Sequence, residues 1–469
     1  MTGEDLSEFR ESGTITPERM RAVDRNAVAL GVSGLQMMES AGKALAESAL
    51  SFSPSRVLIL CGKGNNGGDG MAAARYLQSG VETDLIYLAE EGMSRECAHQ
   101  LAALRYARVR LHPLRCAPDL IPLERLFSEA DVIIDAMLGT GFCGTVREPL
   151  ATCVAYANES PAKVIAADVP TPGTRADRIL AFHRQKHPGS VIVDIGIPYE
   201  AEIFTGPGDL TLIPPRPITA HKGAGGKVLI IGGGPYQGAP YLAGLAALRS
   251  GADLVRIASP VYVPVPDLIF EPLPGERVGE EHRDRLRTLA RDADVVLCGN
   301  GLGTESHQVV TELAPEFRKV VFDADALRLP LPSSPQAIYT PHTGEFMRMT
   351  GITLPADPAE RGRAVKVCAA TCGTVLLKGS TDVISDGTRV RFNRTGTPAM
   401  TVGGTGDVLA GITAALFCHL PAFEAACIAA YVNGKAGMAV EARCGGGLIA
   451  SDLISQIPIE LFRSGTKDA

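Results

Sequence analysis

The chain has 469 residues, a formal net charge of −7 at pH 7, 45% hydrophobic residues and 21% charged residues. This composition predicts a globular protein of two or three domains and excludes a largely disordered chain. The acidic balance argues against a nucleic-acid-binding surface, which needs a clustered basic excess. The eleven cysteines are scattered without a CxxC pair, and MTGEDLSEFRES lacks the apolar core of a signal peptide. We therefore expect a cytoplasmic protein.

The first half of the chain alternates short apolar runs with helical stretches. A helix is expected after residue 70, ending at Gly80. Apolar runs bounded by turn residues predict parallel strands with helices on both faces of the sheet. The expected strands lie at 56–61, 83–89, 130–138, 162–170 and 190–198.

A glycine-rich loop, GKGNNGGDG at 62–70, is expected between the first strand and its helix. Its GxGxxG spacing is that of the dinucleotide fingerprint, and Glu90 after the next strand could hold a ribose. An NAD-dependent dehydrogenase is therefore one alternative. Asn65, Asn66 and Asp69, however, crowd the turn with oxygen ligands. Such side chains suit a hard cation or a ribose and carboxamide edge better than a pyrophosphate.

Two further carboxylates end strands in this half, Asp135 in DAMLGTG and Asp168 in ADVP. A strand-end aspartate often caps the next helix. Parallel strands end at one edge of the sheet, however, and binding sites of open α/β sheets form there. We therefore expect these carboxylates and the glycine loop to share one site.

The segment 205–226 is rich in proline and glycine and ends the first pattern. A second α/β series begins with KVLIIGGG. We place the boundary near residue 213, giving domains 1–213 and 214–469. The expected strand-containing stretches of the second domain are 227–234, 253–260, 293–303, 319–327, 336–346 and 374–379.

Several strand ends of the second half carry polar or glycine-rich turns. The glycines from Gly233 to Gly238 have P-loop spacing, but Ala239 and Pro240 replace the required Lys-Ser/Thr pair, which excludes a Walker loop. His342 lies at a strand end near Glu345, where a ligand is expected. The run LLKGSTD at 376–382 supplies a lysine and two hydroxyls that could contact a phosphate or a ribose.

The run GGTGDVLAG at 403–411 predicts a phosphoryl-transfer site. Three glycines let N–H groups converge on an anion at the positive end of a helix, which we expect to begin at Asp407. A carboxylate beside that anion would be repelled by it. Its useful role is as the general base that takes a proton from the attacking hydroxyl.

The stretch 408–432 is apolar enough to suggest a membrane span. Pro421 and Glu424 interrupt it, however, and leave two pieces shorter than the roughly 20 residues that a span needs. Two buried helices are therefore expected, with no membrane partner.

Over nearly its whole length the chain resembles the bifunctional NAD(P)H-hydrate repair enzymes, an epimerase domain fused to a dehydratase domain. The N-terminal resemblance rests on ITPERMRAVDRNAVALGVSGLQMMESAGKALAE, CGKGNNGGDG, DAMLGTGFCGTVREPL, ADVP and VDIGIP. The C-terminal resemblance rests on AHKGAGGKVLIIGGGPYQGAP, CGNGLG, FDADAL, TPHTGEF, LLKGSTD and NRTGTPAMTVGGTGDVLAG. It implies an α/β fold of two domains, an N-terminal Rossmann-like doubly wound sheet and a C-terminal ribokinase-like domain.

The resemblance implies that the N-terminal domain interconverts the R and S forms of hydrated NADH and NADPH. Asp168 would be its acid–base residue. Potassium would be held by Asn66, Asp135 and Thr171. The substrate would contact Asp168 together with Asn65, Asn66, Gly67, Gly68, Asp69, Gly139, Thr140, Gly141, Phe142, Cys143, Gly144 and Thr145.

The resemblance also implies that the C-terminal domain dehydrates the S form at the expense of ADP or ATP, with Mg²⁺. Asp407 would be the base, and phosphorylation of the hydroxyl would make a good leaving group. The hydrate would contact Ala239, Gly301, His342 and Asp407. The nucleotide would contact Lys378, Gly379, Ser380, Thr381, Asp382 and Gly406. The family also suggests a homo-oligomer with small-molecule partners.

The sequence departs from the family pattern mainly in the epimerase half. DVPTPGTRADRIL stands where the family has Ser-Gly and then Ala-Asp-Thr-Gly, so Thr171 supplies the hydroxyl and Pro172 stiffens the loop. Cys143 stands where some epimerases have lysine. The alternative function is a ribokinase-like small-molecule kinase with a non-catalytic N-terminal module. A dehydrogenase built on the first glycine loop is a further alternative.

Overall fold

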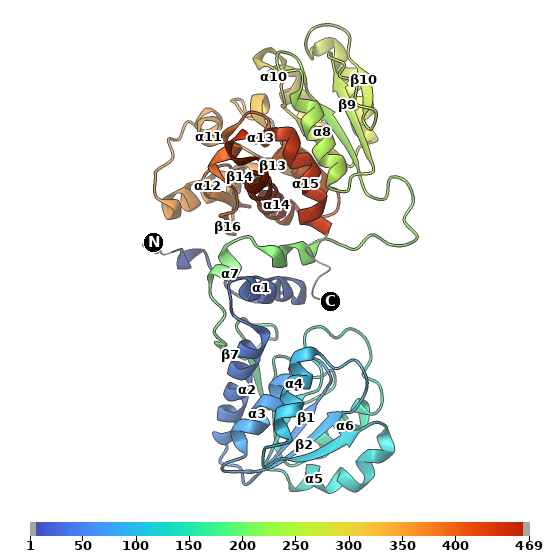
Figure 1. Cartoon of the computed structure of the whole chain (residues 1–469), viewed down its shortest axis with the longest axis vertical. Helices are drawn as coiled ribbons and strands as arrows, with labels where there is room; N and C mark the ends of the chain where they lie inside the picture. The colour runs from blue at the N-terminus through green and yellow to red at the C-terminus, as the bar shows by residue number, and fades with distance from the viewer. Residues whose placement is uncertain (1–5, 463–469) are drawn as a thin grey trace. The chain divides into compact units, whose positions relative to one another are not determined.

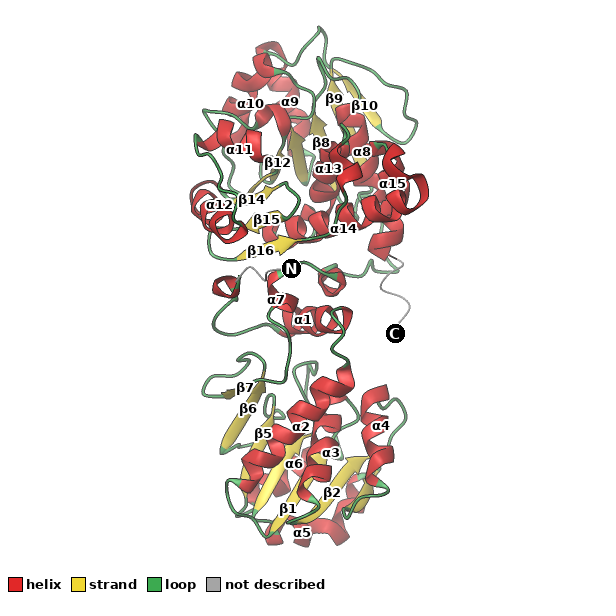
Figure 2. Cartoon of the chain, turned by 60° about the vertical axis from the view of Figure 1, so that its left-hand side comes forward, coloured by secondary structure: helices red, strands yellow, loops and turns green. Residues whose placement is uncertain are grey.

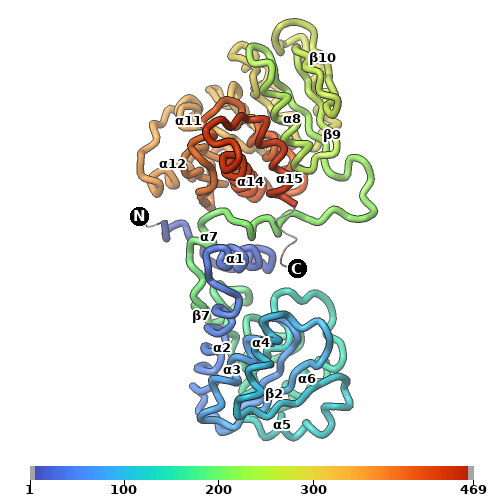
Figure 3. The backbone as a smooth tube through the Cα atoms, viewed as in Figure 1, coloured from blue at the N-terminus to red at the C-terminus, as the bar shows by residue number. Residues whose placement is uncertain are grey.

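The computed structural model describes residues 6–462. The chain forms two compact units (Figure 1). One consists of residues 12–198. The other combines residues 6–11 with residues 199–462. The segment 199–213, which the predicted boundary assigns to the first domain, thus packs with the second unit. Its path can be followed in Figure 3.

The first unit is built on a seven-stranded sheet whose strands are all parallel, as predicted, although only five strands were expected from the sequence. The strand order is β3-β2-β1-β4-β5-β6-β7, so the chain changes direction between β1 and β4. The strands are β1 (Arg56–Cys61), β2 (Glu82–Leu88), β3 (Arg110–Leu114), β4 (Val132–Ala136), β5 (Lys163–Ala167), β6 (Arg178–Phe182) and β7 (Val191–Val193). The helices are α1 (Pro17–Ala29), α2 (Gly34–Leu50), α3 (Asn65–Leu77), α4 (Arg95–Leu104), α5 (Glu124–Glu129) and α6 (Leu150–Glu159).

The first glycine loop is shorter than predicted, because α3 begins at Asn65 and contains most of the residues expected in the loop. Its glycines allow the helix to approach the sheet closely. A Cβ atom on Gly67 would lie 2.0 Å from the carbonyl oxygen of Gly62, and one on Gly70 would lie 2.7 Å from the Cβ of Ala136. These glycines therefore serve helix–sheet packing as well as the turn.

The second unit contains a nine-stranded sheet of order β10-β9-β8-β11-β12-β13-β14-β15-β16. Its strands are parallel except at the β14–β15 and β15–β16 pairs (Figure 2). The strands are β8 (Lys227–Ile231), β9 (Leu254–Ser259), β10 (Ile269–Pro272), β11 (Val295–Cys298), β12 (Val320–Phe322), β13 (Ala337–Tyr339), β14 (Thr374–Leu377), β15 (Asp382–Ser385) and β16 (Val390–Asn393). The helices are α7 (Glu200–Ile203), α8 (Ala239–Arg249), α9 (Arg283–Arg291), α10 (His307–Leu313), α11 (Thr343–Thr350), α12 (Pro358–Cys372), α13 (Thr405–Phe417), α14 (Ala422–Cys444) and α15 (Ala450–Phe462).

Both faces of this sheet are buried. Val228 and Ile230 of β8 pack into one hydrophobic core, and the alternating residues Leu229 and Ile231 pack into another. Successive side chains of a strand point to opposite faces, so helices must cover both. The stretch 408–432 forms α13 and α14 of this packing, as predicted. Within residues 6–462 no helix is both long and apolar enough to cross a membrane.

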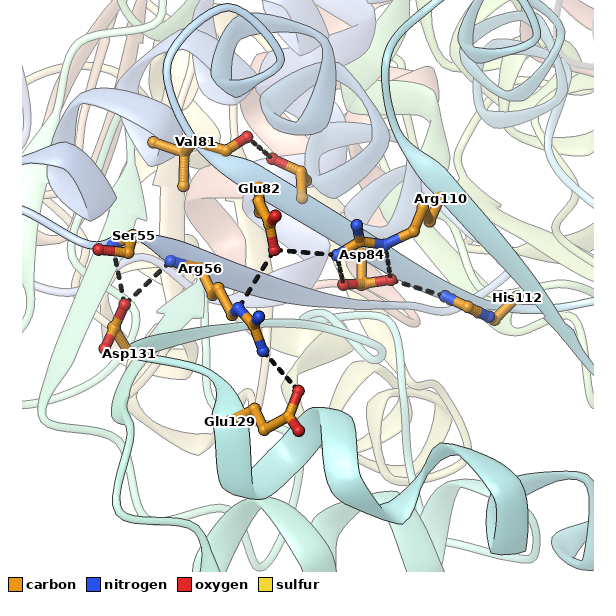
Figure 4. A network of polar contacts seen from close by, with 10 residues as sticks. Ser55, Arg56, Val81, Glu82, Asp84, Arg110, His112, Glu129 and Asp131 are labelled. Atoms are coloured by element: carbon orange, nitrogen blue, oxygen red, sulfur yellow. Dashed lines mark hydrogen bonds and ion pairs between the residues drawn. The ribbon is translucent and has the colours of Figure 1, made fainter.

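Charged side chains gather at the beginning of the first strands of unit 1 (Figure 4). Arg110 of β3 donates two hydrogen bonds, of 2.8 and 2.6 Å, to the Asp84 carboxylate, and His112 lies 2.8 Å from the same group. Arg56 pairs with Glu82. The cations and carboxylates at this edge of the sheet pair with one another. The candidate site lies at the opposite edge.

A buried ion pair fixes the segment 199–213 on the second unit. The Arg391 guanidinium donates to both Asp209 carboxylate oxygens, at 2.7 and 2.8 Å, and also to the carbonyl oxygens of Glu202 and Phe204. The side chains of Arg391 and Asp209 are only 4% and 0% exposed. Removing one partner of a buried ion pair leaves the other charge buried and uncompensated. The resulting loss of folding stability is far larger than the loss on removing one partner of an exposed pair.

We therefore expect Asp209→Ala to destabilise the second unit by about 3–5 kcal/mol. Chemical denaturation of the full chain, followed by a signal from the second unit, measures this loss. Glu8→Ala, which removes the exposed partner of Arg363, is the control and should cost at most about 1 kcal/mol. Equal effects of the two substitutions would contradict the role of Asp209. A C-terminal fragment begun at residue 214 should show the same loss.

Candidate active sites

A cavity of about 530 Å³ opens in unit 1 where β1, β4 and β5 end. It lies at the change of direction between β1 and β4, where open α/β sheets place their ligands. Predicted substrate residues that line it are Asn65, Asn66, Asp69, Gly139, Thr140, Gly141, Phe142 and Asp168. Five other predicted residues lie outside this lining, namely Gly67, Gly68, Cys143, Gly144 and Thr145. Gly67 and Gly68 instead pack inside the unit, against the Gly62 backbone and the Met38 side chain.

Asp168 is held at the end of β5 by two interactions. The buried Lys186 ammonium lies 2.5 Å from its Oδ1, and the Phe182 N–H donates to the same oxygen at 3.2 Å. The Asp168 backbone has φ = +63°, in the left-handed region that side-chain-bearing residues rarely adopt. Such strain costs of order 1–3 kcal/mol and is found mostly at functional sites. The strand end thus directs a fixed carboxylate into the cavity.

Two more carboxyl groups share this cavity with Asp168 and Lys186. Burial, opposed by Lys186, raises the pKa of Asp24 on α1 to about 6. Burial together with the nearby Asp168 and Asp24 raises the pKa of Asp69 well above its ordinary value. Three carboxyl groups lie around one ammonium group, so ionising all three is electrostatically unfavourable. The site as a whole therefore retains at least one proton near neutral pH.

Hydrogen bonds link the three predicted potassium ligands, directly between Thr171 and Asp135 and through the Leu138 backbone to Asn66. Thr171 donates its N–H and its hydroxyl to the two oxygens of buried Asp135, at 2.8 and 2.7 Å. Asn66 donates its amide N–H to the Leu138 carbonyl at 3.2 Å. Its Oδ1 atom is buried and has no hydrogen-bond partner in the described part of the chain. A buried, unsatisfied amide oxygen is a group that a bound hard cation could satisfy.

In unit 2, α13 begins at Thr405, two residues before the predicted start. Gly404 adopts φ = +97°, which makes the sharp turn into the helix, and the Thr405 hydroxyl anchors the turn on the Met400 carbonyl oxygen. No side chain of the described residues caps this N-terminus. Asp407 therefore lies in the first turn, beside N–H groups that remain available to an anion.

A polar network joins Asp407 to the neighbouring strand ends. The Asn300 amide donates to Asp407 at 2.7 Å and to Asp323, after β12, at 3.0 Å. Asp323 also accepts from the Lys378 ammonium at 2.9 Å and from the Thr340 hydroxyl at 2.7 Å. Burial and the charge of Asp323 raise the pKa of Asp407 to about 6. Burial disfavours the charged form of Lys378 and lowers its pKa. The nearby Asp323 and Glu345 carboxyl groups have the larger combined effect, so the pKa of Lys378 is raised.

His342 and Lys378 lie on one edge because a further parallel bridge between them extends the β13–β14 pair. The His342 ring is mostly exposed, and its Nδ1 accepts from the Gly344 and Glu345 N–H groups at the start of α11. Gly301, with φ = +69°, passes so close to the Tyr236 carbonyl oxygen that a Cβ would lie 2.2 Å from it. Ala239 is the first residue of α8. The hydrate residues predicted from sequence thus come from different elements of unit 2.

The predicted nucleotide residues follow β14 in a tight turn. Gly379 and Ser380 are exposed, whereas Asp382 is turned inward and accepts from the Gly379 N–H and the Asn393 amide, both at 2.9 Å. Asp382 therefore shapes the turn. Gly406 lies next to Lys378, whose Nζ would be 3.4 Å from a Cβ added at Gly406. This places a cation beside the positive end of α13.

The comparisons with known proteins cover both units. A family model described as YjeF-related protein N-terminus matches residues 34–178, and one described as NAD(P)H-hydrate dehydratase matches residues 228–459. A protein named bifunctional NAD(P)H-hydrate repair enzyme Nnr, from Methanospirillum hungatei, is 54% identical over 464 residues, which cover 98% of this chain and 97% of the relative. The relative of the same name from Pyrobaculum aerophilum is 43% identical, and the match covers 95% and 97% of the two chains.

The chain belongs to the family of bifunctional NAD(P)H-hydrate repair enzymes. A solved structure of the ADP/ATP-dependent NAD(P)H-hydrate dehydratase from Bacillus subtilis, co-crystallised with ATP and Mg²⁺, is 29% identical. Its TM-score is 0.47, and the match covers 55% of this chain and 96% of that one. Membership of the repair-enzyme family confirms the predicted resemblance and the two-domain α/β fold class.

For this member of the repair-enzyme family, sequence reasoning missed four residues that the structure brings to the two sites. Lys186 was visible only as a lysine within AFHRQKHPG at 181–189, and Asp24 only as a polar residue within α1. Asn300 and Asp323 stand in the strand-end motifs CGNGLG and FDADAL, which drew attention without assigning these side chains a role. Their common signal is a polar residue directly after a buried strand. Glu345, already noted near His342 in the sequence, is buried and lies 3.5 Å from the Lys378 ammonium.

Proposed function

We propose that the N-terminal domain interconverts the R and S hydrates of NADH and NADPH, and that the C-terminal domain dehydrates the S hydrate with ADP or ATP. The observation that carries the proposal is the pairing of a strand-end carboxylate with a cavity in unit 1 and of Asp407 with an open helix N-terminus in unit 2. Family membership favours this function over a kinase of vitamin-like alcohols and over a dehydrogenase.

In the dehydratase site, Asp407 takes the proton of the C6 hydroxyl as its oxygen attacks the terminal phosphorus of the nucleotide. Hydroxide is a poor leaving group, whereas the phosphate formed in this way leaves readily with the C–O electron pair. The first-turn N–H groups of α13 and the Lys378 ammonium stabilise the negative charge that develops on the transferred group. Asn300 orients the Asp407 carboxylate. Ala239, Gly301 and His342 contact the hydrate, and residues 378–382 with Gly406 contact the nucleotide.

In the epimerase site, Asp168 assists the loss and return of the C6 hydroxyl and stabilises the cationic ring between these steps. The substrate contacts are those predicted from the sequence, and the cavity-lining members among them support the proposal most directly. Lys186 and the Phe182 N–H fix the position of the carboxylate. Assembly into a homo-oligomer and a cytoplasmic location stay predictions.

The proposal includes potassium in the N-terminal domain, held by Asn66, Asp135 and Thr171. The buried, unsatisfied Asn66 Oδ1 supports this donor set. A bound potassium ion would supply a fixed positive charge at the edge of the cavity. The proposal also includes Mg²⁺ with the nucleotide. In the described part of the chain no group of three or more His, Cys, Asp or Glu side chains is arranged to hold a metal ion. Mg²⁺ that arrives on phosphates needs only one or two carboxylates.

A spectroscopic assay tests the proposed function. Hydrated NADH lacks the nicotinamide absorbance, so incubation of the S hydrate with the full chain should restore the absorbance only when ADP or ATP is added. Inorganic phosphate should appear in equal amount. Stable transfer of phosphate to a vitamin-like alcohol, with no return of absorbance, would favour the kinase instead. Comparing ADP with ATP in the same assay determines the preferred nucleotide.

The dehydration rate should depend on pH through Asp407. A base must be ionised to act, so the rate should fall as the pH drops through about 6, where Asp407 binds a proton. The Asn300 hydrogen bond lowers the pKa of Asp407. Asn300→Ala should therefore move this acidic limb to higher pH, which a pH–rate profile of dehydration measures. Gln308→Ala, an exposed amide on α10, is the control and should leave the limb in place. An unmoved limb in Asn300→Ala would contradict the coupling.

A further inference from the structure

Asp24 is a cavity-lining carboxyl group that the mechanism above leaves without a role. It projects from α1 into the cavity that also contains Asp168, so a helix and a strand end each supply one carboxyl group to the same space. The Asp24 side chain has no hydrogen bond or ion pair with any described residue, whereas Asp168 is fixed by Lys186. Partly burying a carboxyl group without a hydrogen-bond partner costs free energy. A ligand that donates a hydrogen bond to the group would offset this cost.

Inversion at C6 needs chemistry on both faces of the nicotinamide-derived ring. One group protonates the departing hydroxyl, the C–O bond breaks with its electron pair on oxygen, and water leaves as the ring nitrogen lone pair forms the N=C6 bond. Water then adds to the opposite face of C6, the N=C6 electrons return to nitrogen, and a second group accepts the proton. In either direction the two groups together hold one proton, and nothing is consumed.

We propose that Asp24 is the second acid–base residue of the epimerase, and that it serves the face of the ring opposite to the face served by Asp168. This inference rests on the proposed epimerase function. Asp168 is in contact with the Lys186 ammonium, whereas Asp24 has no cation in contact and is suited to carry the proton.

The charges around Asp24 support this division of roles. Burial is the largest influence on its pKa, which rises to about 6. Lys186 lowers this pKa and Asp168 raises it. A group with this pKa exchanges its proton readily near neutral pH, as a general acid must. The other charged groups that line the cavity are Arg21, Lys63, Asp69, Asp168 and Lys186.

Asp69 is the competing candidate. It is more deeply buried than Asp24. Burial, Asp168 and Asp24 raise its pKa well above the ordinary value. The Asp24 side chain is the more exposed of the two, so it is more accessible to the substrate and to the incoming water. The greater exposure of Asp24 in the cavity therefore assigns the transfer to Asp24.

The test measures epimerisation of the R hydrate by the full chain, with dehydration of the S hydrate as an internal activity. Asp24→Asn should lower kcat for the R hydrate by about 10²–10⁴-fold with little change in KM. In the wild type the epimerisation rate should fall as the pH rises and Asp24 loses its proton. Asp24→Asn should abolish that alkaline limb, and Asp24→Glu should restore part of both rate and limb.

Glu47→Gln on the exposed surface of α2 is the matched control and should behave as the wild type. The proposal is overturned if Asp24→Asn stays within about threefold of the wild-type kcat, or if it changes only KM. It is also overturned if Asp69→Asn, and not Asp24→Asn, abolishes the alkaline limb. If the wild-type chain itself fails to accelerate loss of the R hydrate, the epimerase function fails, which is a separate outcome. Unchanged dehydration of the S hydrate shows that each variant is folded in its second unit, and circular dichroism checks the first.

Discussion

Replacing Asp407 by asparagine should abolish dehydration of the S hydrate and leave nucleotide binding nearly intact. Loss of a positioned general base lowers a rate by about 10²–10⁴-fold. The asparagine keeps the size of the side chain and an oxygen for the 2.7 Å hydrogen bond from Asn300. In the proposed site the anion is bound by the first turn of α13 and by Lys378, so removing a negative charge beside them should not weaken nucleotide binding.

Two measurements on this variant separate the roles. Turnover is followed by the return of nicotinamide absorbance, and nucleotide affinity by calorimetry. Asp357→Asn is the matched control, because asparagine is as good an N-cap as the aspartate that begins α12. Near-normal turnover in Asp407→Asn would remove Asp407 from the role of base. A large loss of nucleotide affinity would instead place Asp407 in the nucleotide site.

Replacing Asp168 by alanine in the full chain should remove the acceleration of R-hydrate loss while dehydration of the S hydrate continues at the wild-type rate. The expected loss of epimerisation is about 10²–10⁴-fold. The two effects separate because Asp168 and Asp407 belong to different compact units. Asp168→Ala also leaves the buried Lys186 ammonium without its carboxylate, which destabilises the first unit.

Asp168→Asn therefore accompanies the alanine variant, because its amide oxygen still accepts from Lys186 and from the Phe182 N–H. Both variants should lose epimerisation, and Asp168→Asn should remain folded by circular dichroism. Persistent acceleration of R-hydrate loss in either folded variant would refute the assignment of Asp168.

Local pattern predicted the sheets well, because buried parallel strands give short apolar runs that end at turn residues. The strand at 56–61 has the predicted bounds, and Asp168 lines the cavity at the carboxyl ends of the strands as expected, whereas Asp135 is not among the residues that line it. Pattern was less informative about helix starts. The glycines near the starts of α3 and α13 favour a loop prediction because glycine is flexible, yet Gly67 lies inside α3 and allows close packing, and Gly404 makes a left-handed turn before α13.

The partners of the predicted residues could not be found from the sequence. Lys378 meets Asp323 only because β12 and β14 both flank β13 in the sheet. Asp24 reaches the cavity from a helix that precedes the first strand, so no strand-end pattern marks it. The segment ending near Leu212 belongs with the second unit through the Arg391–Asp209 pair, a long-range contact that composition does not reveal.

The progress curve for an equilibrated mixture of R and S hydrates tests the central claim most directly. The full chain with excess nucleotide should restore the nicotinamide absorbance of the whole pool, and the R fraction should react faster than it epimerises spontaneously. Asp168→Asn should reduce the curve to a fast S phase followed by the spontaneous rate, and Asp407→Asn should leave the absorbance unrestored. Recovery that stops at the S fraction with the wild-type chain, or that proceeds without nucleotide, would contradict the account.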